Sequence, residues 1–352
     1  MNLGVKPDIF VDYEYGDLRE VVVGVPYAIY PDYKVARWAQ ESTKVLPEAE
    51  RKKIRERSGK DTYELGKYEL MEEENLKLIS ILQDKHGVRV WRPDVLYWQG
   101  VAQNFGEDWI RFAGVVQQYT RDPVTVIGNN VIENTMGSLY RRADILGFRK
   151  LFLDRLLGSD ARWVAMPGVD YSLMIREGLF EKTGFPVLEG GDVIVLGKTV
   201  LVGISANPAT GSSELGYQWL KSYLGPMGYE VKDVPLQKEI LHLDIALSVP
   251  RPGLIIVCPD AFVRGIEEYF PKHEWKTIMF SVEEATHLAI NGLPINQDTY
   301  VIGTNEHFDA EKLERDLNDH GVRTVYRIPF AHHTEDGGSI RCSTHPLVRR
   351  MR

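Results

Sequence analysis

Apolar residues recur along the chain in a regular order: a strand or hairpin rich in Val and Ile, an amphipathic helix, and a second strand. Five copies of this unit follow one another. Their elements are predicted at 18–24, 72–86 and 88–93; 124–132, 146–157 and 162–166; 193–202, 214–223 and 229–234; 245–257, 262–269 and 276–280; and 299–302, 310–320 and 322–328. No linker rich in Pro, Gly or Ser separates the copies. We therefore predict a single pseudo-symmetric α/β domain over residues 1–352.

Turn residues and one insert add detail to this outline. The hairpins of the second, third and fourth units carry Asn129-Asn130, Gly197-Lys198 and Pro250-Arg-Pro-Gly253 at their predicted turns. The first unit is interrupted by a charged segment at about 34–70. Its Glu48-Ala-Glu-Arg-Lys-Lys53 stretch is typical of the solvated face of a helix. We expect a charged helical insert there.

Side chains that can do chemistry stand where one unit gives way to the next. Asp122 precedes the second unit, Glu189 and Asp192 precede the third, His242 and Asp244 precede the fourth, and Cys342 follows the fifth. In a radially repeated architecture, the loops entering each unit point toward one centre. We therefore predict that these side chains meet in one pocket.

Composition and charge narrow the class of partner. With 352 residues, of which 43% are hydrophobic and 26% charged, the chain can bury a large core. Its net charge of −8 argues against nucleic acid or an anionic membrane as the main partner, because neither is attracted to an acidic surface. A small-molecule substrate is the simpler expectation. The sequence does not decide whether the protein forms a homo-oligomer.

The N-terminal segment and the two cysteines indicate the cellular compartment in which we expect the protein. The N-terminus has no basic segment followed by an apolar run, and no stretch approaches about 18 uninterrupted apolar residues, so we expect a soluble cytoplasmic protein. Cys258 lies in the apolar run Leu254-Ile-Ile-Val-Cys258 and is predicted to be a small buried hydrophobic residue. Cys342 lies in a polar, glycine-containing turn. Two free thiols in a reducing compartment are expected rather than a disulfide.

Cys342 is the candidate nucleophile. The thiolate is the reactive form, so it needs a nearby base or positive charge. His242 can act as a general acid or base. The alternation in Leu241-His-Leu-Asp244 predicts a strand on which His242 and Asp244 share one face. The sequence thus supplies a sulfur, an imidazole and several carboxylates for one site.

Each of these residues also has a simpler interpretation. Asp122 before Pro123 is by itself typical of a turn, and Glu189-Gly-Gly-Asp192 is by itself an ordinary loop in which backbone and ligand can come close. His332, His333 and His345 are expected to pack locally. No second His occurs at ligand spacing from His242, so no metal site is predicted.

Several carboxylates around one Cys and one His suit a cation. A planar guanidinium is matched by carboxylates, and its carbon can be attacked by a thiolate while His passes a proton to the departing amine. The nucleophile, the acid and the electrostatic groups are all side chains, so no cofactor is implied.

Four motifs in order resemble the guanidino-group-modifying superfamily of amidinotransferases, arginine deiminases and dimethylarginine hydrolases. They are Thr120-Arg-Asp-Pro123, Glu189-Gly-Gly-Asp192, His242-Leu-Asp244 and Gly337-Gly-Ser-Ile-Arg-Cys342. The resemblance extends from Gly16 to Cys342 and implies a five-bladed α/β propeller of ββαβ-type units. It also implies that Cys342 is the nucleophile, that His242 is the general acid/base, and that Asp122, Glu189 and Asp244 hold the guanidinium.

The resemblance divides between two branches. The segments Val131-Ile-Glu-Asn-Thr-Met136, Glu214-Leu-Gly-Tyr-Gln-Trp-Leu220 and Arg251-Pro-Gly-Leu254 are similar to glycine and inosamine-phosphate amidinotransferases. By contrast, Glu189-Gly-Gly-Asp192 is typical of the hydrolytic branch, and Arg341-Cys-Ser-Thr-His-Pro-Leu347 is closer to some deiminases. We predict an amidinotransferase with an arginine-like donor and an amine acceptor. The alternatives are a hydrolase of the same superfamily and a non-catalytic guanidinium-binding protein.

The sequence shows no evident arginine to bind the carboxylate of an arginine-like substrate, at the end opposite its guanidinium. The positions where relatives carry a carboxylate-binding Arg hold Ala206-Asn-Pro208 and Ala261 here. Arg264 or Arg141 is predicted to take that role, the latter because it lies nineteen residues beyond Asp122 on a segment expected to face the pocket. Asp192 and Asn207 are further predicted contacts of the substrate.

Overall fold

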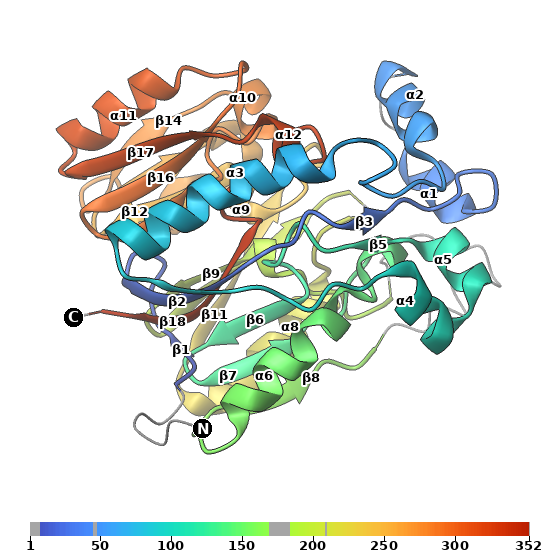
Figure 1. Ribbon diagram of the computed structural model, residues 1–352. Helices are drawn as coiled ribbons and strands as arrows, with labels where there is room; N and C mark the ends of the chain where they lie inside the picture. Colours follow the sequence, from blue (N-terminus) through green and yellow to red (C-terminus); the bar gives the residue numbers. More distant parts are fainter. Residues whose placement is uncertain (1–7, 45–47, 169–183, 208–209, 352) are drawn as a thin grey trace.

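The computed structural model describes residues 8–44, 48–168, 184–207 and 210–351. This part of the chain contains five sheets of three or four strands and one sheet of two strands (Figure 1). The two-stranded sheet pairs β3 (Ala28–Ile29) with β5 (Val115–Val116). The predicted α/β class is confirmed.

Four sheets share one topology, in which an antiparallel hairpin is joined by a third strand that runs parallel to its second strand. Their strands are β6 (Val124–Ile127), β7 (Asn130–Glu133) and β8 (Arg162–Ala165); β9 (Val193–Leu196), β10 (Thr199–Ser205) and β11 (Glu230–Leu236); β12 (Leu247–Arg251), β13 (Leu254–Val257) and β14 (Lys276–Met279); and β15 (Leu293–Asn296), β16 (Thr299–Thr304) and β17 (Thr324–Pro329). Three groups coincide with the second, third and fourth predicted units, whereas β15 precedes the predicted start of the fifth unit at residue 299.

The remaining sheet brings the two ends of the chain together. Its order is β1 (Phe10–Val11), β18 (Thr344–Arg350), β2 (Asp17–Val23) and β4 (Arg89–Trp91). The last strand, β18, runs antiparallel to β2, so it completes the same hairpin-like plan as in the other sheets. The sequence pattern does not single out β18, because its partner lies at the other end of the chain. This strand follows Cys342 directly and anchors the cysteine turn.

Helices connect or flank the sheets. They are α1 (Arg37–Ser42), α2 (Glu48–Arg57), α3 (Tyr68–Ser80), α4 (Trp98–Phe105), α5 (Glu107–Ala113), α6 (Arg149–Leu156), α8 (Glu214–Leu224), α9 (Leu243–Ala246), α10 (Val282–Thr286), α11 (Ala310–Asp319) and α12 (Ala331–Thr334). The N-terminus of α8 is capped by the hydroxyl of Ser213, which accepts a hydrogen bond from the amide of Gly216. The predicted helices at 72–86, 146–157, 214–223 and 310–320 are present, the second beginning as a 3-10 segment.

Two local predictions are wrong. The second hairpin turns at Gly128 and Asn129, because Asn130 already pairs with Ile127, and Gly128 has the positive φ of 57° that such a turn requires. No α-helix forms at 262–269, where Ile266–Glu268 is a short 3-10 segment; a second 3-10 segment, Pro259–Ala261, precedes the predicted range. Phe262 and Gly265 have extended backbone there, with ψ of 135° and 140°.

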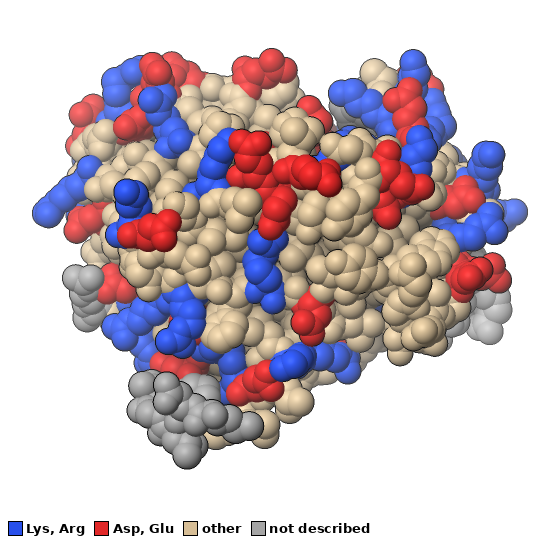
Figure 2. Space-filling model, in the orientation of Figure 1, with Lys and Arg blue, Asp and Glu red and all other residues tan. Residues whose placement is uncertain are grey.

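The packing confirms the interpretation of Cys258. It is fully buried in the apolar cluster around β12, β13 and β14, and it is not bonded to the other cysteine. Figure 2 shows basic and acidic side chains interspersed over one face of the molecule. Ion pairs between such side chains include Arg92 with Glu72, at 2.8 Å. Among the described residues, no helix has the length and apolar character needed to cross a membrane.

The charged insert is helical, as expected, but it is not only a solvated surface. It contains α1 and α2, and α2 stands away from the sheets in Figure 1. At the end of the insert, Arg57 Nη1 and Lys67 Nζ both donate to Asp336 Oδ1, at 2.6 and 2.7 Å. Asp336 lies in the turn that leads to Cys342. The insert therefore braces the loop that carries the candidate nucleophile.

Candidate active site

A cavity of about 220 Å³ gathers residues from loops that are far apart in the sequence. It is lined by Tyr30, Val116, Gln118, Tyr119, Asp122, Ser138, Tyr140, Arg141, Glu189, Thr210, Leu241, His242, Asp336, Gly337 and Cys342. Of the predicted site residues, Cys342, His242, Glu189, Asp122 and Arg141 thus lie together. Asp244, Asp192, Arg264 and Asn207 are not among the lining residues.

His242 is held between two carboxylates. Its Nε2 lies 2.5 Å from Glu189 Oε2, and its Nδ1 lies 3.8 Å from Asp122 Oδ1. Burial by itself lowers the pKa of this imidazole, but the charges of Asp122, Asp192 and Glu189 outweigh it and raise the pKa to about 10. At neutral pH, His242 is therefore an imidazolium that can donate a proton.

The predicted strand through His242 and Asp244 is wrong. His242 has extended backbone, but Leu243 begins the short helix α9, so Asp244 lies on that helix. The two side chains consequently join different networks. The alternation of apolar and polar residues cannot distinguish a four-residue helix from a strand, because the segment is too short to show a period.

Asp122 uses both carboxylate oxygens within the protein. Oδ1 accepts from the amide of Gly191 at 2.9 Å, and Oδ2 accepts from Arg141 Nη1 at 2.8 Å. Burial favours the neutral acid, but the charges of His242 and Arg141 and these hydrogen bonds lower the pKa of Asp122 below its usual value. Asp122 is thus an ionised carboxylate beside the imidazolium.

The two glycines of Glu189-Gly-Gly-Asp192 are required by close packing, Gly191 against His242 and Gly190 against the backbone of Arg121. A Cβ on Gly191 would lie 2.6 Å from His242 Nδ1 and 2.9 Å from Asp122 Oδ1, and a Cβ on Gly190 would lie 2.0 Å from the carbonyl oxygen of Arg121. The loop interpretation of this motif is therefore insufficient, because the backbone passes directly against the imidazole.

Replacing Gly191 with alanine is expected to displace the His242 ring and lower kcat by about 10²-fold, as small misplacements of catalytic groups do. Steady-state kinetics with a thermal melt of the same protein measures this. The matched control is Gly225→Ala, where a Cβ has open space. Equal kcat in the Gly191 and Gly225 variants would contradict the requirement for close approach.

Cys342 is 95% buried, with an exposed fraction of 5%. Its amide donates to Asn291 Oδ1 at 3.1 Å, and its thiol donates to Asp244 Oδ2 over 3.7 Å. Burial, followed by the negative charges of Asp244 and Asp122, raises the pKa of this thiol well above its ordinary value. Without a bound cation, Cys342 is therefore a neutral thiol, contrary to the expectation of an adjacent group that generates the thiolate.

Asp244 sits behind the sulfur. It is fully buried, and its Oδ2 also accepts from Arg341 Nη1 at 2.8 Å. Arg341 in turn donates to both carboxylate oxygens of Glu14, at 3.2 and 3.1 Å. Although burial opposes ionisation, Arg341 and Arg121 lower the pKa of Glu14 to about 2. Asp244 Oδ1 is buried and has no hydrogen-bond partner within the described residues.

Glu14, Arg341 and Asn291 are functional neighbours that the sequence does not single out. Arg341 stands beside Cys342 in the chain, which is a usable signal for it. Glu14 and Asn291 have none, because they reach the site from other parts of the fold. The same holds for Tyr30, which donates to Asp336 Oδ2 at 2.5 Å on the wall of the cavity.

Three predicted substrate contacts do not line the cavity. Asp192 is fully buried, and its oxygens accept from the amides of Leu243 and Ser212 at 2.9 and 2.7 Å, so it braces the loop of His242 instead. Arg264 is half-buried, does not line the cavity and pairs with Asp233 and Glu268. Asn207 is half-buried and does not line the cavity. Arg141 does line it.

A metal centre finds no support in the described residues, which contain no group of three or more His, Cys, Asp or Glu side chains arranged to hold an ion. The cavity instead combines one imidazolium, one thiol and carboxylates. Such a set can bind a cation, deliver a nucleophile to it and protonate a leaving group.

Known proteins resemble the whole chain, although no family model matches it. The glycine amidinotransferase of Xenopus tropicalis is 23% identical over 367 residues, covering 96% of this chain and 82% of that protein. The solved inosamine-phosphate amidinotransferase of Streptomyces griseus has a TM-score of 0.75 at 20% identity, covering 98% and 97% of the two chains. A cyanobacterial arginine dihydrolase domain has a TM-score of 0.61 at 16% identity, covering 95% of this chain and 98% of that domain.

These relatives are amidinotransferases and arginine-processing enzymes. They confirm the resemblance to the guanidino-group-modifying superfamily and the prediction of an enzyme. The solved neighbours have α/β propeller-like folds, in agreement with the sheets described above.

Proposed function

We propose that this chain is a cysteine-dependent amidinotransferase that takes an amidino group from arginine or a related guanidino compound and passes it to an amine. The observation that carries the proposal is the single cavity in which Cys342, His242 and Asp122 meet from three separate loops. The resemblance of the whole chain to amidinotransferases supports transfer as the reaction. The five sheets described above would be the five blades of one propeller domain.

The first step is attack by the sulfur. A guanidinium bound beside Cys342 adds positive charge where Asp244 and Asp122 now disfavour the thiolate, so the substrate itself lowers the pKa of its nucleophile. Asp244 Oδ2 accepts the hydrogen bond of the thiol and is placed to take its proton. The sulfur then forms a bond to the guanidine carbon, giving a tetrahedral adduct.

The second step expels an amine. The bond between the guanidine carbon and the substrate's alkyl nitrogen breaks, and the imidazolium of His242 gives that nitrogen its proton. The products are a free amine and an amidino group bound to Cys342 as a thioether. His242 is left neutral and can act as a base in the return half of the reaction.

The return half repeats these steps with a new amine. The acceptor nitrogen attacks the amidino carbon, neutral His242 takes its proton, and the bond from carbon to sulfur breaks while Asp244 returns its proton to the leaving sulfur. Every proton given in the first half is recovered in the second, so neither a cofactor nor an oxidant is required.

The carboxylates divide into different roles. We assign Asp122 and Asp244 to the guanidinium, since Asp122 lines the cavity and Asp244 has an oxygen without a partner. Glu189 is assigned to His242, because its Oε2 contacts the imidazole and its Oε1 accepts from the amide of Gly137 at 3.0 Å. Arg141 is the candidate for the carboxylate of the substrate.

Transfer predicts a dependence on the acceptor. With arginine alone, turnover is expected to stop after one equivalent of ornithine, and with glycine, lysine or another amine it is expected to continue with a matching guanidino product. Chromatography of ornithine, citrulline and guanidino compounds measures this. Citrulline formed at an equal rate without any acceptor would overturn transfer.

A hydrolase is the second candidate, and Glu189-Gly-Gly-Asp192 favours it because this motif resembles the hydrolytic branch. In that reaction, neutral His242 would activate water instead of an amine for attack on the same thioether. Steady citrulline production from arginine alone is its distinguishing result.

A further inference from the structure

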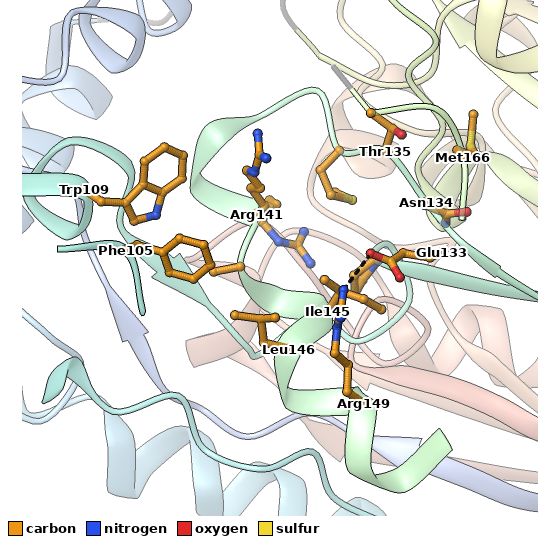
Figure 3. A pocket seen from close by; sticks show the side chains of 15 residues that line it. Phe105, Trp109, Glu133, Asn134, Thr135, Arg141, Ile145, Leu146, Arg149 and Met166 are labelled. Carbon is orange, nitrogen blue, oxygen red and sulfur yellow. Dashed lines mark hydrogen bonds and ion pairs between the residues drawn. The ribbon is translucent and has the colours of Figure 1, made fainter. Parts of the chain in front are cut away.

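A second cavity, of about 260 Å³, adjoins the first, and Arg141 lines both. Phe105 and Trp109 lie on one side of it, and Asn134 and Met166 lie on the other (Figure 3). The proposed reaction uses no other side chain that lines it. Its size suits a small molecule of a few heavy atoms.

Asn134 presents an unused acceptor to this cavity. Its exposed fraction is only 8%, and its Nδ2 donates to the carbonyl oxygen of Asp122 at 2.7 Å and to Thr125 Oγ1 at 2.8 Å. These bonds determine which end of the amide is nitrogen, because a carbonyl oxygen can only accept. Asn134 Oδ1 has no partner in the protein. A buried acceptor of this kind normally accepts a hydrogen bond, so we expect a ligand in this cavity to donate one to Asn134 Oδ1.

The wall around Trp109 presents donors and positive charge. Trp109 Nε1 is buried without a partner, and the guanidinium carbon of Arg142 lies 5.8 Å from the centre of the Trp109 ring. Arg141 and Arg149 also line the cavity, whereas Glu133 is its one acidic lining residue in the described chain and pairs with Arg149 at 3.3 Å. The cavity therefore favours an anionic group near Trp109.

We infer that the second cavity binds a small amino-acid-like zwitterion that acts as an effector of the enzyme. Its carboxylate would accept from Trp109 Nε1 and Arg142, and its ammonium group would donate to Asn134 Oδ1. The apolar side chains of Ile145, Leu146 and Met166 would contact the remainder of the molecule.

Two direct contacts link this cavity to the catalytic one. Arg141 donates to the Asp122 carboxylate, and Asn134 donates to the Asp122 carbonyl oxygen. An anion in the second cavity attracts the Arg141 guanidinium and weakens its hold on Asp122 Oδ2. That oxygen then becomes available to the substrate guanidinium. In this proposal, the gain of a buried carboxylate for the guanidinium exceeds the loss of contact between Arg141 and the substrate's carboxylate, so the effector strengthens substrate binding, and the substrate strengthens effector binding equally.

Fluorine NMR of protein labelled with 5-fluorotryptophan tests the site directly. The Trp109 resonance is assigned by its absence in Trp109→Phe, and the protein is titrated with glycine, L-leucine and L-methionine, each to about 10 mM. Acetate, methylamine and inorganic phosphate are the probes that carry only one of the two charges. At least one amino acid is expected to shift the resonance saturably, and Arg142→Gln is expected to weaken that binding about tenfold or more.

The matched control is Arg162→Gln, which removes an exposed arginine outside both cavities and is expected to leave binding and basal activity unchanged. The inference is overturned if no amino acid shifts the resonance, if the shift survives in Arg142→Gln, or if acetate or phosphate binds as well as the amino acids do.

A kinetic arm tests the coupling and rests on the proposed function. The saturating amino acid is expected to lower KM for arginine about fivefold with little change in kcat. An unchanged KM would overturn the effector role. If arginine is not turned over at all, the proposed function fails, while the NMR titration still decides whether the second cavity binds its ligand.

Discussion

Replacing Cys342 with alanine is expected to lower turnover by about 10⁶-fold, to the limit of detection, because the substitution removes the atom that carries the amidino group. Substrate binding should persist, since Asp122 and Asp244 keep their charges. Initial rates with arginine and an amine acceptor measure the loss. The matched control is Cys258→Ala, a buried thiol in the apolar core that is expected to retain kcat.

The same experiment addresses the covalent intermediate. With arginine and no acceptor, intact-protein mass spectrometry is expected to detect an added amidino group on the native protein and on Cys258→Ala, but not on Cys342→Ala. Unchanged turnover in Cys342→Ala would refute the covalent route and favour a guanidinium-binding protein without catalysis.

Replacing His242 with glutamine is expected to lower kcat by about 10² to 10⁴-fold, the usual contribution of a general acid. Because the pKa of His242 is raised to about 10, the protonated form prevails at neutral pH and is lost only as the pH rises through that value. The native enzyme should therefore lose activity on the alkaline side near pH 10, and the variant should lack this limb. The pH profile of kcat measures it.

Glu189→Gln is the informative companion to that variant. It keeps a hydrogen-bond acceptor beside His242 but removes one of the charges that raise its pKa. The alkaline limb is expected to move to lower pH while the fold is retained, as followed by circular dichroism. If the alkaline limb lies at the same pH as in the native enzyme, the charge of Glu189 does not contribute to the raised pKa of His242.

The elements that were predictable are those defined by neighbouring residues. Val and Ile runs around Gly197-Lys198 identify the β9 and β10 hairpin, since both strands and their turn lie within a short stretch. The motif residues Cys342, His242 and Asp122 were also identifiable, because each lies in a short motif of reactive and turn-forming residues that can be read locally. Pairing between the chain ends, as in β18 with β2, has no such local signal.

The hydrogen-bond and ion-pair partners of each carboxylate could not be predicted from the sequence. Glu189, Asp192 and Asp244 all occur in recognisable motifs, yet one contacts His242, one accepts two backbone amides, and one pairs with Arg341. The task of a carboxylate depends on which donors occupy its oxygens, and those donors come from other parts of the fold.

The sequence alone therefore determined which reactive side chains the protein contains and their order along the chain, because both can be read from short segments. Only the tertiary structure decided that the Cys342 thiol is buried among negative charges and neutral without a bound cation, and that the pKa of His242 is raised so that its imidazole is protonated at neutral pH. The physical reason is electrostatic, since both pKa values are set by burial and by charges brought together through space.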